Sequence, residues 1–123
     1  MATVRMALAA ALLFLASGCG SSYSTPTTPT TPSSGGGGTP VAIVRGAENL
    51  TTTAYNPSPV TVAVGGSVTW TNSDTVTHTS TGSTWNSGGI APGANYTMTF
   101  PTAGTFTYHC TLHPGMTGTV TVQ

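Results

Sequence analysis

The chain has 123 residues, a formal net charge of zero and 3% charged side chains. A chain of this length holds one domain, which is too small for a large substrate cavity with a catalytic framework. Two basic residues in all exclude nucleic-acid binding, because phosphates are neutralised by clustered Lys and Arg. The same scarcity of charge excludes electrostatic steering of a highly charged partner.

Residues 1–18 have the pattern of a signal peptide. One cation, Arg5, precedes an apolar run over residues 7–16, which has the length of a signal core and is too short to span a bilayer. The end of this run, from Leu15 to Cys19, resembles the cleavage box of bacterial lipoproteins, with Ala16 where Leu is usual. The resemblance implies export to the periplasm or the outer cell surface, and a membrane anchor through lipid on Cys19. Ordinary cleavage nearby is the alternative, and it also exports the chain.

Residues 19–40 are rich in Ser, Thr, Pro and Gly. The Thr/Pro part favours extended polyproline-like conformers and the Gly-rich part is flexible. Too little apolar surface is present to offset the entropy of ordering. We therefore expect a flexible tether between Cys19 and a domain at residues 41–123, although a spacer with no role fits the composition equally well.

Residues 41–123 alternate apolar and polar side chains with a period of two, which is typical of half-buried strands. Turn signals such as Gly65-Gly66 and Ala91-Pro92-Gly93 separate the runs. We expect an all-β domain, an antiparallel sandwich or barrel. The expected inward faces are Val60, Val62 and Val64; Val68 and Trp70; Tyr96, Met98 and Phe100; Phe106, Tyr108 and Cys110; and Val120 and Val122.

A candidate metal site lies at the end of the apolar run Phe106, Tyr108 and Cys110. Cys110 is followed by His113 at three residues and by Met116 at six, across a Pro-Gly loop. A lone Cys is often a small core residue, but thiolate, imidazole and thioether together select copper over magnesium or calcium. The second imidazole is either His78 or His109. His109 is adjacent to Cys110 on a strand and should leave the opposite face, so His78 is favoured.

Residues 56–123 resemble the cupredoxins, the blue-copper proteins. The two-residue gap between His113 and Met116 is similar to the short ligand loop of amicyanin rather than the longer loop of plastocyanin. The residues that carry the resemblance are Pro57, Val60 to Val62, Gly66, Val68 to Asn72, His78, Ser87-Gly88, Pro92-Gly93, Phe100, Ala103-Gly104, Tyr108 to Cys110, His113, Pro114 and Met116.

The resemblance implies a Greek-key β-sandwich and one copper per chain, cycling between Cu(I) and Cu(II), with His78, Cys110, His113 and Met116 as ligands. It also implies a monomer that carries single electrons between redox partner proteins. Many cupredoxins have Asn directly after the first His ligand, where it ties the two ligand loops together, but this chain has Thr79. We expect the Thr79 N–H to donate to the Cys110 sulfur and its hydroxyl to supply part of the tie.

Electron transfer is the favoured function, and an envelope protein for copper storage or delivery is the alternative. Storage proteins typically use more Met, and only Met98 and Met116 lie beyond the predicted signal. A copper enzyme needs further His ligands and only His109 is left over, so we expect no enzymatic activity. For electron entry we expect the ring edge of His113 to reach the surface within a small apolar patch that includes Pro114.

Overall fold

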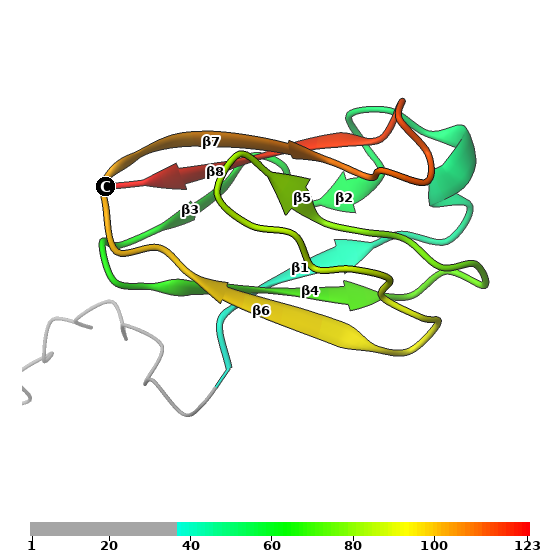
Figure 1. The fold of residues 1–123 in the computed structure, drawn as a ribbon, viewed down its shortest axis with the longest axis horizontal. Helices are drawn as coiled ribbons and strands as arrows, with labels where there is room; N and C mark the ends of the chain where they lie inside the picture. Colours follow the sequence, from blue (N-terminus) through cyan, green and yellow to red (C-terminus); the bar gives the residue numbers. More distant parts are fainter. Residues whose placement is uncertain (1–36) are drawn as a thin grey trace, which may run out of the picture. The chain divides into compact units, whose positions relative to one another are not determined.

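The computed structural model describes residues 37–123 and places them in two four-stranded sheets (Figure 1). The first sheet has the order β2-β1-β4-β6 and the second the order β3-β8-β7-β5. The predictions for the signal peptide, the lipidated Cys19 and most of the tether fall outside the described residues. The elements are β1 (Thr39–Ile43), the short 3-10 helix η1 (Ala47–Asn49), β2 (Tyr55–Asn56), β3 (Val60–Val62), β4 (Ser67–Asn72), β5 (Thr81–Gly82), β6 (Asn95–Thr99), β7 (Gly104–His109) and β8 (Thr117–Val122).

The predicted all-β fold is confirmed, with two differences of detail. Two strand pairs, β1 with β4 and β3 with β8, are parallel, so both sheets are mixed rather than antiparallel. The sequence pattern gives strand positions but not strand direction, because alternation looks the same in either case. Val64 was expected to face inward and is instead exposed. β3 ends at Val62, and the chain then turns through Gly65, whose φ is 82°.

The core lies between the sheets and is built on aromatic side chains. Trp70 of β4 is fully buried, and its ring centroid lies 5.3 Å from that of Tyr108 on β7. Trp85, which the sequence pattern did not place, stacks on Trp70 at 5.9 Å and donates from Nε1 to the Ser80 hydroxyl. Burying a side chain of this size contributes on the order of 2–3 kcal/mol. The expected inward positions are buried in β3, β4 and β8, whereas Tyr96, Met98 and Phe106 are only half-buried.

The arrangement of the strands brings two loops together at one end of the sandwich. β4 ends at Asn72, and the chain then loops towards His78. β7 ends at His109, and a second loop runs to the start of β8 at Thr117. Both loops lie at the end opposite the C-terminus (Figure 1). Within residues 37–123 no helix is long and apolar enough to cross a membrane.

Candidate metal centre

The second loop is closed by its own backbone. The Met116 N–H donates to the His113 carbonyl at 2.9 Å, and the Cys110 N–H donates to the Met116 carbonyl at 3.1 Å. Cys110 continues the inward face of β7 after Tyr108 and is completely buried, as is Met116. Cys110 is the free cysteine of the described part of the chain. The loop therefore holds three candidate ligands in a fixed backbone.

His78 is held by the first loop, beyond the end of β4. Its N–H donates to the Ile90 carbonyl at 3.2 Å and its own carbonyl accepts the Ile90 N–H at 2.7 Å. The Asn72 side chain donates to the carbonyls of Val76 and Ile90, both at 2.8 Å. His78 is completely buried. The loop that carries it is thus anchored at both ends.

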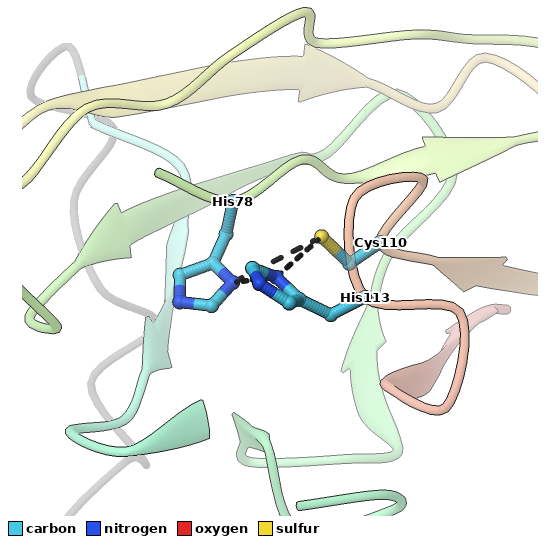
Figure 2. Close-up of side chains that lie close together, drawn as sticks. All are labelled: His78, Cys110 and His113. Atoms are coloured by element: carbon cyan, nitrogen blue, oxygen red, sulfur yellow. Dashed lines mark hydrogen bonds between the residues drawn. The ribbon is translucent and has the colours of Figure 1, made fainter. Parts of the chain in front are cut away.

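Figure 2 shows the side chains of His78, Cys110 and His113 converging on one point. The Cys110 Sγ lies 3.9 Å from the His78 Nδ1 and 3.7 Å from the His113 Nδ1, and the two nitrogens are 3.2 Å apart. The centre of such a triangle is about 2 Å from each atom, close to the bond lengths of a d-block metal to nitrogen and sulfur. The three donor atoms fit one metal ion.

The donor set also has the right chemistry for copper. Two imidazoles and a thiolate in a trigonal arrangement, with a weak axial Met, are the ligands of blue-copper electron-transfer sites. Met116 is buried on the same loop as Cys110 and His113. The structure thus brings together the donor atoms of three of the four predicted ligands, His78, Cys110 and His113. The fourth, Met116, lies at the end of the loop that carries Cys110 and His113.

Thr79 ties the two loops together. Its backbone N–H donates to the Cys110 Sγ at 3.3 Å. Its hydroxyl oxygen accepts the Thr111 N–H at 2.9 Å and lies 3.2 Å from the Thr111 hydroxyl. Both contacts expected of Thr79 are confirmed. A Thr in this position therefore connects the loops directly.

The remaining residues near the site divide between the interior and the surface. His109 is exposed on the opposite face of β7 from Cys110, as the alternation of the strand predicts. His113 is half-buried and lies between two exposed apolar residues, Leu112, which is 55% exposed, and Pro114. This placement agrees with the prediction that the His113 ring has an accessible edge with apolar surroundings at Pro114.

Sequence reasoning missed two buried groups behind the site. The Asp74 carboxylate contacts the His78 Nε2 at 2.8 Å; an Asp four residues before a candidate ligand, in a chain with only two acidic residues, was the available signal. The Tyr55 hydroxyl donates to the Thr79 carbonyl at 2.5 Å. Burial, followed by the nearby Cys110, raises the pKa of Tyr55 well above its usual range. Tyr55 therefore stays protonated and holds the Thr79 peptide from behind.

Comparisons with known proteins point the same way. The family model of copper binding proteins of the plastocyanin/azurin family matches residues 79–123. A plastocyanin from Scenedesmus fuscus is 37% identical over an alignment of 84 residues, which covers 56% of this chain and 86% of the relative. Among solved structures, a purple cupredoxin from Nitrosopumilus maritimus is 30% identical with a TM-score of 0.65, covering 69% of this chain and 99% of that one. A mutant of amicyanin in its reduced Cu(I) form is 29% identical with a TM-score of 0.60, covering 71% and 83%.

Proposed function

This chain belongs to the plastocyanin/azurin family of copper-binding proteins, and on that premise we propose that it carries single electrons on one type 1 copper. The family binds one copper, and its members are typically electron-transfer proteins. We propose His78, Cys110, His113 and Met116 as the ligands. When bound, copper supplies the Cu(I)/Cu(II) couple, and the protein supplies a fixed set of donors.

The observation that carries this proposal is the convergence of the Cys110 Sγ with the Nδ1 atoms of His78 and His113 at 3.2–3.9 Å. Electron transfer is fastest when the ligands move little between the two oxidation states. The closed ligand loop and the Thr79 tie restrict such movement, because each ligand loop is hydrogen-bonded to itself or to the other. The buried sulfur is shielded from solvent, which favours a stable thiolate–metal bond.

The test is a titration of the apo-protein with Cu(II), followed by visible absorption. We expect an intense thiolate-to-copper charge-transfer band that saturates at one copper per chain. Cys110→Ser should abolish the band and His78→Ala should remove or strongly alter it. His109→Ala is the matched control, because this exposed ring lies next to Cys110 in sequence but on the other face. Loss of the band in His109→Ala with retention in His78→Ala would mean that the ligands are wrongly assigned.

We also propose that the protein is an exported lipoprotein, anchored to a membrane through Cys19, which works as a monomer with redox proteins of the cell envelope. Support comes from the apolar run over residues 7–16, the small residues before Cys19 and the polar segment after it. Intact mass of the membrane fraction should give a chain that begins at Cys19 with added lipid. An unmodified amino terminus at another residue would contradict the anchor.

A further inference from the structure

The carboxylate of Asp74 is buried and fully engaged in hydrogen bonds. Its Oδ1 accepts the Gly46 N–H at 2.9 Å and the Thr75 N–H at 2.8 Å. Its Oδ2 accepts the Ala47 N–H at 3.1 Å and lies 2.8 Å from the His78 Nε2. The side chain of Asp74 is 2% exposed and that of His78 is 0% exposed. The carboxylate therefore links the far side of the His78 ring to the distant segment at Gly46 and Ala47.

This environment defines the charge of Asp74 and the tautomer of His78. The carboxylate accepts three backbone N–H groups, from Gly46, Ala47 and Thr75, and a carboxylate that accepts several such hydrogen bonds is held in its anionic form. An anionic carboxylate at 2.8 Å from Nε2 requires a proton on that nitrogen. The Nδ1 lone pair of His78 is then free to face the Cys110 sulfur and the His113 ring.

We propose that Asp74 is a positioning residue for the copper site, which holds His78 in the Nε2–H tautomer and, by its buried charge, lowers the reduction potential. This inference rests on the proposed function. A carboxylate bonded to the back of an imidazole makes the coordinating nitrogen more basic. A fixed negative charge in a buried site also favours the higher cation charge, because such charges are poorly screened. Both effects stabilise Cu(II) relative to Cu(I).

The chain offers a matched control in Glu48. Its carboxylate oxygen lies within 4.8 Å of the ligand-type atoms of both Asp74 and His78. Glu48 is nevertheless exposed, and its hydrogen bond goes to the Asn49 side chain rather than to His78. Removing one negative charge from either position changes the net charge equally. The two substitutions therefore differ in burial and in the bond to the His78 ring.

The experiment compares Asp74→Asn with Glu48→Gln by redox titration of the blue copper band. Loss of a carboxylate that orients a metal-bound His typically changes metal affinity about tenfold or more. A tenfold loss of preference for Cu(II) over Cu(I) raises the potential by about 59 mV. We expect Asp74→Asn to keep the blue colour with this upward shift. Glu48→Gln should shift the potential by less than about a third as much, because solvent screens its charge. Equal potentials in the two variants would overturn the proposal.

A second measurement covers the case in which Asp74→Asn does not fold. Long-range proton–nitrogen NMR of the copper-free wild-type protein reports the tautomer of each imidazole, without a metal on Nδ1 that would itself place the proton on Nε2. We expect His78 to carry a slowly exchanging proton on Nε2, and a proton on Nδ1 or fast exchange at Nε2 would overturn the proposal. A wild-type protein that gives no blue band with Cu(II) contradicts the proposed function itself. A protein that turns blue with Cu(II) but has the wrong His78 tautomer when copper-free contradicts only the role of Asp74.

Discussion

The Thr79→Val substitution tests whether the hydroxyl of Thr79 joins the two ligand loops. Val has nearly the same shape, so the change removes the hydroxyl and little else. The Thr79 oxygen accepts the Thr111 N–H at 2.9 Å and lies 3.1 Å and 3.2 Å from the hydroxyls of Thr81 and Thr111. Thr79 is 4% exposed, so little water can replace these bonds on its side.

The expected cost follows from these contacts. A hydrogen bond contributes a net ~0.5–1.5 kcal/mol to stability. Thr111 is exposed, so its freed N–H can bond to water and the full penalty of a buried unsatisfied donor does not apply. We expect the free energy of unfolding of the copper-free protein to fall by about 1–2 kcal/mol. For a domain of this size that lowers the melting temperature by about 4–8 °C per kcal/mol.

Urea unfolding of the copper-free protein measures this change, and Thr81→Val is the control. Thr81 is half-buried, and its hydroxyl lies within hydrogen-bond distance of the Thr79 hydroxyl and the Asn86 side chain. We expect Thr81→Val to cost less than about 0.5 kcal/mol, as is usual at such sites. Copper should also dissociate faster from Thr79→Val than from Thr81→Val. Equal stabilities and equal dissociation rates in the two variants would refute a role of Thr79 in joining the loops.

Three further predictions concern the surface and the core. Electron transfer from a small protein donor should depend little on ionic strength, and Pro114→Glu should slow it; a strong salt dependence in the wild type, or an unchanged rate in the variant, would place electron entry elsewhere. Gly118→Ala should cost about 3 kcal/mol in urea unfolding, because its Cβ would overlap the Tyr108 ring. Gly115→Ala should cost far less, because its Cβ would make only an ordinary contact with the Thr51 methyl group at 3.9 Å. Burial raises the pKa of Tyr108 to about 12 from 10.0. The contribution of the neutral, buried phenol to the free energy of unfolding is therefore complete below pH 10.0 and is lost as the pH rises towards 12. A circular dichroism signal that does not decrease over that interval would contradict this.

The sequence predicted the strands and the ligand loop because both depend on local spacing. Alternation at Val68 and Trp70 identifies a strand, and the distances from Cys110 to His113 and Met116 fit a single closed loop. The alternation of β7 favoured His78 over His109, since Cys110 faces inward and His109 outward. These inferences need neighbours in sequence and little knowledge of the rest of the fold.

The surroundings of the site were not predictable in the same way. Asp74 accepts bonds from Gly46 and Ala47, which are 28 and 27 residues away, and no periodicity connects such distant segments. The parallel pairing of β1 with β4 likewise depends on how the chain crosses between sheets. The prediction that Val64 faces inward was wrong for a local reason, because the alternation of apolar residues continues past Val62 but the strand ends there. Long-range hydrogen bonds and strand direction therefore had to come from the structure.

The two ligand loops leave different sheets, β4 in one and β7 in the other. A metal shared by His78 and Cys110 is therefore a cross-link between the layers, which closes a loop of more than thirty residues. Any ligand that binds only the folded chain stabilises it in proportion to the logarithm of its concentration over its dissociation constant. Loss of copper and separation of the two layers are then coupled events, so the protein's resistance to unfolding should follow the copper supply and its oxidation state.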